Sequence, residues 1–308
     1  MTMRDDIERD GYVVARKLLS TNEIARLRDG LLEHFQHSWN TEGLGKHQPN
    51  AAVEIASIGW IFVCPAILSV FRELYGRDDL IFTGNCDAHM NMLSWWHKDT
   101  SEGQGGCFGG DYFSREDCRV YRAGIYLQDH ESQHGLTVRT GSHRTRSLTS
   151  GVVETLHTRA GDVIFFDIRL THAGQFADPL QALLLRLGRK LRRDSLAAAC
   201  GDRYRRFFRR PSKLSIFFTF GTRSPDTDEY CEFELAAKKN RGFADSTYLP
   251  AALLADLSAA SVEFHPAMAR RGRAVASFPI GSASALRHAR SDSATGAQAQ
   301  VEAIPRDP

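Results

Sequence analysis

The chain has no Cys-x-x-Cys pair, no internal repeat and no apolar run long enough to cross a membrane. Its six cysteines are scattered along the sequence: Cys64, Cys86, Cys107, Cys118, Cys200 and Cys231. This spacing excludes a zinc knuckle and a dense disulfide framework, so we expect reduced thiols. The N-terminus also lacks the basic and then apolar composition of a signal peptide. Together these absences predict a soluble cytoplasmic protein with no membrane contact.

The chain carries little net charge, +2 over 308 residues, but its basic residues are concentrated in one segment. Residues 186–210 hold ten Lys or Arg and two Asp, a net charge of +8. We interpret this segment either as a lid whose arginines meet an anionic group or as an amphipathic surface helix with a solvated charged face. The near-neutral balance of the whole chain, without a basic platform of interleaved aromatics, argues against nucleic acid as a partner.

The length and a hydrophobic content of 42% allow one large core. We predict one domain over residues 1–278 with four parts: N-terminal helices (1–78), a β-rich core (about 79–235), a basic helical insert in that core (about 183–210) and a C-terminal helical extension (236–278). Residues 279–308 have almost no large apolar side chains, which predicts a disordered tail.

Local patterns predict the main elements. Residues 4–35 read as two helices around the strand GYVVARKLL, with Thr21 capping the second helix. Short strands from about residue 80 to 166, with no long helices between them, favour an antiparallel sandwich or jelly roll over a parallel sheet. Residues 214–221 are predicted as a late strand of the same barrel.

The most informative motif is His97-Lys98-Asp99, followed far downstream by His172. The first histidine and the aspartate follow the apolar run 90–96, and alternation along a strand places residues i and i+2 on one side. Because His172 lies just beyond a second strand-like run, all three side chains can converge inside one barrel. Two imidazoles and one carboxylate leave the opposite face of a metal open, which suits a non-heme Fe(II) that binds a co-substrate and O₂. The pattern therefore indicates an oxygenase, and the alternative is a set of unrelated polar residues.

Four stretches then identify a resemblance: IERDGYVVARKLLSTNEIARLRDGL, WWHKDT, YRAGIYLQDHESQHGLTVRTGSHR and GDVIFFDIRLTHAGQ. Over most of residues 5–235 the chain resembles the phytanoyl-CoA dioxygenase-like family of Fe(II)/2-oxoglutarate oxygenases. The resemblance implies a mainly β fold, a double-stranded β-helix (jelly-roll, cupin-like) core flanked by helices. It further implies that His97, Asp99 and His172 ligate Fe(II), with 2-oxoglutarate and O₂ as co-substrates.

The chain departs from this family at the residue that should hold the distal carboxylate of 2-oxoglutarate. An arginine is usual there, but Lys213 takes its place, and Ser215 supplies the expected hydroxyl. A lysine keeps the positive charge and loses the planar two-pronged geometry. Arg210 and Arg186 are the competing anchors, and a solvated strand-end lysine is the alternative interpretation of Lys213. Tyr126 and Gln128 loosely match positions where the family contacts the co-substrate.

Other residues near the motif have two interpretations each. The turn Gly141-Ser142-His143 matches the family's Pro-Gly-Ser-His element, with Thr140 in place of proline, and we interpret His143 as a support rather than a ligand. Trp95 is expected to share the inward face with His97 and to pack in the core or line a pocket. Asp167 and Arg169 either order the site or form a strand-end ion pair.

The predicted reaction is hydroxylation of an unactivated C–H bond in a small molecule or carrier-linked metabolite, an oxidative tailoring step in secondary metabolism that releases succinate and CO₂. The substrate is anionic if the basic insert contacts it. Related halogenases carry a small residue where Asp99 stands, so halogenation is disfavoured, while desaturation, epoxidation and cyclisation stay open. Two other classes also stay open: a zinc-dependent hydrolase or lyase, which the same ligand set would serve, and a non-catalytic jelly-roll binding protein.

Overall fold

The computed structural model describes residues 2–37, 41–42, 44–100, 113, 115, 117–130, 135–191, 194–208, 211–240 and 249–270. Three sequence predictions lie outside this part of the chain: the tail at 279–308, the anchor candidate Arg210 and the thiol of Cys107. Within the described residues, the other five cysteines form no disulfide.

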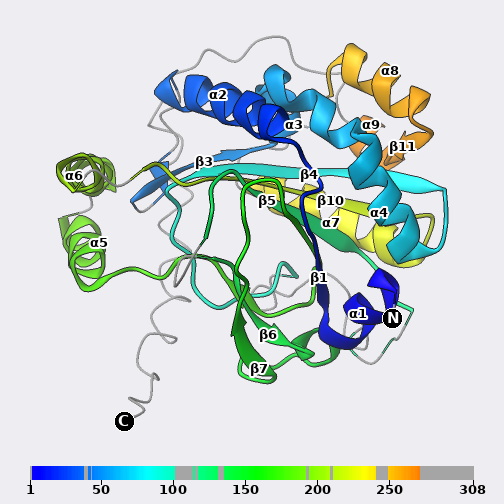
Figure 1. Cartoon of the computed structure of the whole chain (residues 1–308), viewed down its shortest axis with the longest axis horizontal. Helices are drawn as coiled ribbons and strands as arrows, with labels where there is room; N and C mark the ends of the chain where they lie inside the picture. The colour runs from blue at the N-terminus through cyan, green and yellow to red at the C-terminus, as the bar shows by residue number, and fades with distance from the viewer. Residues whose placement is uncertain are drawn as a thin grey trace.

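Helices gather near the N-terminus, in the insert and near the C-terminal end of the described chain (Figure 1). They are α1 (Met3–Asp10), α2 (Thr21–His37), α3 (Ala51–Glu54), α4 (Pro65–Tyr75), α5 (Pro179–Leu191), α6 (Asp194–Phe207), α7 (Pro225–Asn240), α8 (Ala251–Ala259) and α9 (Pro266–Arg270), with 3-10 helices η1 (Ala56–Val63) and η3 (Ser142–Arg144). The strands are β1 (Tyr12–Ala15), β2 (Thr41–Glu42), β3 (Gly45–Pro49), β4 (Leu80–Met90), β5 (Tyr121–Tyr126), β6 (Thr137–Thr140), β7 (Val152–Thr155), β8 (Val163–Asp167), β9 (His172–Ala173), β10 (Leu214–Thr222) and β11 (Val262–Phe264).

The strands form two sheets, and nearly all of their pairs are antiparallel. The large sheet has the order β1-β8-β5-β10-β4-β3-β2, and β11 joins it by pairing in parallel with β4. The small sheet has the order β7-β6-β9 and lies below the large sheet in Figure 1. Antiparallel sheets that stack around one interior are the layer arrangement of a jelly roll. The predicted mainly β fold with flanking helices is thus confirmed.

The large sheet has two different faces because side chains alternate along each strand. On β10, Leu214, Ile216, Phe218 and Phe220 belong to the main core, which the helices α2 and α4 cover from above. Aromatic rings fill the centre of this core, with ring centroids 5.0 Å apart for Phe71 and Phe165. This helix-covered face is the apolar layer that holds the large sheet rigid.

The opposite, inner face of the large sheet is apolar on β8, where Ile164 and Phe166 cluster with Phe217, and is polar toward β4. It carries Asn85, Asp87, Arg122 and Ser215, the last of which alternates with the core residues of β10. Deep in the barrel the side chain of Asn85 donates to the hydroxyl of Tyr230 on α7, 2.6 Å away, and Tyr230 is fully buried. Partly exposed inner residues lie instead toward Met90 and Leu214, where β4 ends and β10 begins. Solvent therefore reaches the interior from that end.

Several local predictions need adjustment. Ser20, not Thr21, caps α2: its hydroxyl accepts from the backbone N–H of Glu23, 3.3 Å away, and the Glu23 carboxylate accepts from the backbone N–H of Ser20, 2.7 Å away. Thr21 is instead the first helical residue. The strand predicted between the two N-terminal helices is β1. Residues 1–78 also supply β2 and β3 to the large sheet, and the predicted C-terminal helical extension supplies β11. Short strands at the edge of a sheet carry a weak sequence signal.

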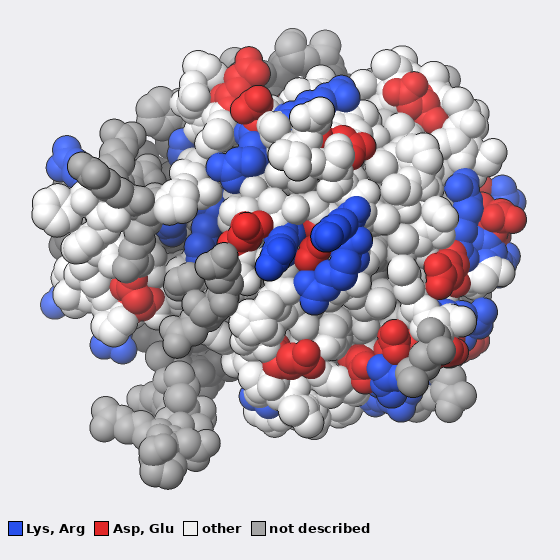
Figure 2. All heavy atoms as spheres, viewed as in Figure 1, with Lys and Arg blue, Asp and Glu red and all other residues white. Residues whose placement is uncertain are grey.

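The basic insert is helical, as its composition predicts. The helices α5 and α6 follow β9 and precede β10 along the chain, and they pack against each other. Helix α6 also contacts β2 at the edge of the large sheet (Figure 1). The side chains of Arg186, Lys190 and Arg203 are exposed. On the face shown in Figure 2, basic and acidic side chains of the described residues are interspersed rather than separated by sign.

In the described chain, no single helix is both long and apolar enough to cross a membrane. The helices Ala56–Val63 and Pro65–Tyr75, which meet at 44°, reach that length and apolar content only when they are taken together. Many of the apolar side chains of this pair are buried in the main core.

We expect Phe218→Ala to lower the free energy of unfolding by about 3–5 kcal/mol, because the substitution leaves a cavity among packed aromatic rings. Phe207→Ala is the matched control, since Phe207 is 81% exposed, and it should change stability by less than about 0.5 kcal/mol. Urea denaturation of the two variants measures the difference. Equal effects would contradict our assignment of the main core.

Candidate metal centre

The structure brings together the three residues that the sequence predicts as metal ligands. The Oδ1 atom of Asp99 lies 3.5 Å from Nε2 of His97 and 3.7 Å from Nε2 of His172. The three ligand atoms are all within 4.8 Å of one another, and the imidazole centroids are 4.3 Å apart. His172 and Asp99 are largely buried, while the side chain of His97 is 45% exposed. The group therefore lies at the inner wall with one side toward solvent.

The backbone brings these residues together in a way that differs from the expected strand. Residues 91–96 are not a strand, because β4 ends at Met90. Instead His97 and His172 form an isolated antiparallel bridge, with N–H···O distances of 3.0 and 2.9 Å in the two directions. The N–H of Asp99 donates to the carbonyl of Ile168, 3.0 Å away. Three backbone hydrogen bonds thus hold the two ligand segments side by side.

Each histidine is oriented by a carbonyl two residues before it. Nδ1 of His97 lies 2.7 Å from the carbonyl oxygen of Trp95, and Nδ1 of His172 lies 3.0 Å from that of Leu170. A carbonyl can only accept, so each Nδ1 carries the hydrogen and each Nε2 presents its lone pair toward Asp99. This orientation of the free nitrogen is the one that a metal-binding imidazole needs.

The electrostatics favour the metal-ligating protonation state at Asp99 and His172, and favour the charged imidazolium at His97. Burial alone would raise the pKa of Asp99, but the Arg122 guanidinium and His172 hold that pKa far below its usual range. Burial, reinforced by His97, lowers the pKa of His172 to about 4. Burial also disfavours charge on His97, but the neighbouring Asp99 carboxylate outweighs burial and raises the pKa of His97. At neutral pH Asp99 is ionised and His172 is neutral.

Arg122 is a site residue that the sequence analysis did not select. It lies on the inner face of β5, where its Nη1 is 3.1 Å from Oδ2 of Asp99 and its Nη2 is 2.6 Å from Oδ2 of Asp87. The contact with Asp99 is an ion pair without hydrogen-bond geometry, so Oδ2 is buried with no hydrogen-bond partner among the described residues. The available signal was alternation in YRAGIY, which places Arg122 on the same face as Tyr126.

Lys98 lies between His97 and Asp99 in the sequence. Its side chain contacts backbone groups behind the metal group and so helps to hold the two ligands in place. Its buried ammonium donates to the carbonyls of Ser142 and Arg169, at 2.7 and 2.6 Å. The hydroxyl of Ser142 accepts from the backbone N–H of Thr171, 2.8 Å away, next to His172. The Gly-Ser-His turn therefore supports both ligand segments through its serine.

Two other predicted supports are resolved differently. Nε2 of His143 lies 3.2 Å from the carbonyl oxygen of Glu8, so this histidine contacts α1 rather than a ligand. Asp167 and Arg169 form a buried ion pair at 2.7 Å, and the guanidinium also donates to the carbonyl of Cys118 at the same distance. This buried pair flanks Ile168, whose carbonyl accepts from Asp99, and the carbonyl of Arg169 accepts from Lys98.

The residues predicted to hold 2-oxoglutarate lie together at the open end of the barrel. The ammonium of Lys213 donates to the side-chain oxygen of Gln175, 2.7 Å away, on the segment that follows His172. Ser215 and Tyr126 are register partners on adjacent strands of the inner face. The side-chain oxygen of Gln128 accepts from the backbone N–H of Leu214, 2.8 Å away, and so fixes the start of β10.

The remaining candidates are placed as follows. Arg186 is exposed on α5, and Arg210 lies outside the described residues. Trp95 is 55% exposed, so the expectation that it packs in the core is wrong. Trp96 lies under the guanidinium of Arg139, 4.7 Å from the ring centroid, and beside Phe176.

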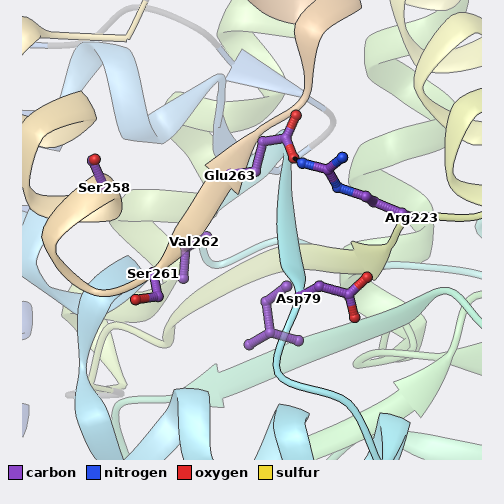
Figure 3. A pocket seen from close by; sticks show the side chains of 7 residues that line it. Asp79, Arg223, Ser258, Ser261, Val262 and Glu263 are labelled. Carbon is purple, nitrogen blue, oxygen red and sulfur yellow. Dashed lines mark hydrogen bonds and ion pairs between the residues drawn. The ribbon is translucent and has the colours of Figure 1, made fainter.

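A separate hollow of about 420 Å³ lies at the other end of the strands (Figure 3). Its lining includes Asp79 and Leu80 at the start of β4, together with Val262 of β11. The ion pair between Arg223 and Glu263, 2.6 Å, lies against it. It contains no member of the metal group, and we assign it no role.

Fold and ligand arrangement together define a jelly-roll protein with a two-histidine, one-carboxylate group on its inner wall. No protein-family model and no curated protein matches the chain. Among solved structures, it is similar to the non-heme alpha-ketoglutarate-dependent epimerase SnoN from nogalamycin biosynthesis, with a TM-score of 0.50, 16% identity, and coverage of 71% of this chain and 81% of that one.

It is also similar to the non-heme alpha-ketoglutarate-dependent carbocyclase SnoK from the same biosynthesis, with a TM-score of 0.50, 14% identity, and coverage of 71% and 82%. At these identities the likeness shows the fold alone. The resemblance to the phytanoyl-CoA dioxygenase-like family stays a prediction.

We expect the stability of the metal-free protein to fall as the pH is lowered from about 6.5 to about 4. The ordinary pKa of histidine is about 6.5, and that of His172 is about 4 in the folded chain, so the unfolded chain binds more protons in this window. His172 contributes a loss of up to about 3 kcal/mol in this window. The raised pKa of His97 acts above about pH 6.5, where stability falls as the pH rises. His172→Gln should flatten the pH profile from urea unfolding, whereas substitution of the exposed His157 by Gln should not. An equally steep profile in His172→Gln would contradict the assignment.

Proposed function

We propose that this protein is an Fe(II)/2-oxoglutarate-dependent oxygenase that acts on a small molecule. The observation that carries the proposal is the convergence of His97, Asp99 and His172 from two segments of the inner wall, with both Nε2 atoms directed at one carboxylate. Two neutral imidazoles and one carboxylate on a single face are the donor set of non-heme Fe(II) oxygenases. Two proteins of similar fold, SnoN and SnoK, are described as non-heme and alpha-ketoglutarate dependent, which supports the same class.

The residues fit the metal by their chemistry. Asp99 is ionised, and its Oδ1 faces the two free imidazole nitrogens while Oδ2 faces Arg122. Arg122 thus leaves one carboxylate oxygen for the metal and favours binding through that single atom. Bound Fe(II) would supply the activation of O₂ and the oxidation of a substrate C–H bond, coupled to decarboxylation of 2-oxoglutarate to succinate and CO₂.

Lys213 is the proposed anchor for the distal carboxylate of 2-oxoglutarate, and Ser215 contributes a hydroxyl. The two alternate with Leu214, whose side chain lies in the main core, so Lys213 and Ser215 share the inner side of the strand. The contact of Lys213 with Gln175 places the Lys213 ammonium beside the segment that carries His172. Tyr126, next to Ser215 in the sheet register, and Gln128, which positions Leu214, complete the proposed co-substrate site. Arg122 is less suitable as an anchor because two carboxylates already share it.

The finer reaction is also a proposal. A carboxylate at position 99 occupies the place that a halide would need, so we favour hydroxylation over halogenation. SnoN and SnoK are described as an epimerase and a carbocyclase, so proteins of this fold direct related chemistry to different outcomes. The same ligands would also accommodate Zn²⁺ for hydrolysis, and the experiments below distinguish the two metals by their oxygen and co-substrate dependence.

Metal binding and co-substrate turnover test the ligand assignment. Substituting His97 or Asp99 by Ala should weaken Fe(II) binding about 100-fold or more and abolish succinate formation, because each removes one of only three protein ligands. His157→Ala, at an exposed histidine, is the matched control and should change neither. Affinity is measured anaerobically by competition with a chromogenic chelator, and succinate by mass spectrometry. Unchanged Fe(II) affinity in both ligand variants would exclude this metal site.

The anchor is tested separately. Lys213→Ala should raise the KM for 2-oxoglutarate by about 10- to 100-fold, the range expected for loss of a charged hydrogen bond, and leave Fe(II) affinity unchanged. Lys213→Arg keeps the charge and should recover part of the loss. Lys190→Ala removes an exposed lysine from α5 and is the control. A normal KM in Lys213→Ala would reject Lys213 as the anchor.

A further inference from the structure

Three polar side chains on β3 and β4 lie beside the metal group and have no part in the chemistry proposed above. They are His47, Asp87 and His89, and we call them the β3–β4 wall. Nε2 of His47 is 3.4 Å from Oδ1 of Asp87, and the rings of His47 and His89 are 4.9 Å apart at 65°. The three side chains therefore form one continuous polar surface.

The strand register places this wall at the open end of the barrel. His47 pairs with His89, His89 with Ser215, and Ser215 with Tyr126, so one row of side chains crosses four adjacent strands of the inner face. The wall is one end of this row, and the proposed 2-oxoglutarate residues are the other. Asp87 lies one step deeper, paired with Phe217.

The wall is reached by solvent, whereas the residues below it are not. The side chains of His47 and Asp87 are 21% and 17% exposed, although both belong to strands inside the sheet. Further into the barrel, Asn85 and Thr219 are buried against Tyr230. The accessible polar surface therefore begins at the mouth of the barrel and ends at Asp87.

Arg122 connects the wall to the metal group. One of its terminal nitrogens contacts Asp87 at 2.6 Å and the other contacts Asp99 at 3.1 Å, while the guanidinium lies 5.4 Å from the ring centroid of Phe217. A molecule that touches Asp87 is thus separated from a metal ligand by a single side chain. Another part of a molecule bound there would have to reach the metal group itself, because reacting atoms must come within about 3–3.5 Å of each other.

The charge of the wall selects among ligands. Asp87 and Asp99 share the single guanidinium of Arg122, so the carboxylates in this part of the site outnumber the arginine by one. A carboxylate or phosphate placed here would be repelled by Asp87. A hydroxyl group can donate to the carboxylate and accept from an imidazole, and an ammonium group gains the charge as well.

We propose that the β3–β4 wall is the substrate-binding site and that the substrate is a hydroxyl-bearing, aminated small molecule of the amino-sugar type. This inference rests on the proposed oxygenase function, because it takes the metal group as the reacting centre. It differs from the anionic ligand that the basic insert suggests, since the charge on the inner wall is of the opposite sign.

Three probes of one shape and different charge test the charge preference: glucosamine, glucose and glucuronate. Binding is measured by saturation-transfer NMR on the Zn²⁺-loaded protein with 2-oxoglutarate, and again without either. We expect the affinity order glucosamine, then glucose, then glucuronate. No binding of any probe at millimolar concentration, or the reverse order, would overturn the proposal.

Asp87→Asn tests the residue itself, because the amide keeps an acceptor for Arg122 and removes the charge. It should weaken glucosamine binding about tenfold or more and reduce the discrimination against glucuronate. His47→Gln is a milder change near the sheet edge and should weaken the binding of all three probes. Asp78→Asn is the control, because this side chain is 97% exposed, and it should change the binding of none. Unchanged glucosamine binding in both wall variants would reject the site.

These outcomes can be separated from failure of the oxygenase proposal. Sugar binding is read without turnover, so charge-selective binding that depends on Asp87, in a protein that forms no succinate, would retain the site and reject the reaction. Succinate formation by the wild type with no sugar selectivity would do the opposite.

Discussion

The backbone bridge between His97 and His172 is the contact on which the site depends. Reciprocal N–H···O bonds of 3.0 and 2.9 Å join a segment that follows β4 to a segment that follows β8. Neither histidine lies in a long strand, so sheet pairing alone does not fix the position of the first one. The bridge ties His97 to His172, which is part of the small sheet. Hydrogen bonds of Lys98 and Ser142 to backbone groups support the same two segments. The imidazole orientations follow, since each Nδ1 is held by a carbonyl of its own segment.

Charge inside the barrel is balanced along a short chain of contacts. Asp99 faces two imidazoles on one side and Arg122 on the other, and Arg122 in turn faces Asp87. An isolated carboxylate in this position would be costly to bury, and the guanidinium makes the charged form stable at the inner wall. The same guanidinium rests on the ring of Phe217. Glycine is required at position 124, because a Cβ there would come within 2.8 Å of that ring. Arg122 thus contacts both carboxylates and the aromatic ring that packs over Gly124.

The sequence was sufficient for the fold class and for the grouping of the three proposed ligands, and the reasons are physical. Period-two alternation and the lack of long helices between strands identify antiparallel sheets. The grouping of the ligands was predicted correctly although one of the two expected strands is absent, because the bridge between His97 and His172 takes its place. The sequence was not sufficient for the conformation of residues 91–96, where an apolar run imitates a strand. It also did not reveal Arg122, Asp87 or His47, because their importance comes from neighbours on other strands. The sequence singled out the turn that contains Ser142 but did not reveal the role of this serine, since its contacts are with groups of distant segments.

The inserted hairpin α5–α6 leaves the barrel after His172 and returns just before Lys213, and the Lys213 ammonium contacts Gln175 across the base of that excursion at 2.7 Å. The two ends of the insert are therefore clamped together by residues of the barrel. The entropy of closing a loop grows only with the logarithm of its length, so lengthening the connection between α5 and α6 would change the stability of the barrel little. The two ends of the insert therefore mark the boundary between the hairpin and the barrel. Evolution, or an engineer, can exchange this hairpin at the sheet edge and leave the ligands and the co-substrate strand in place.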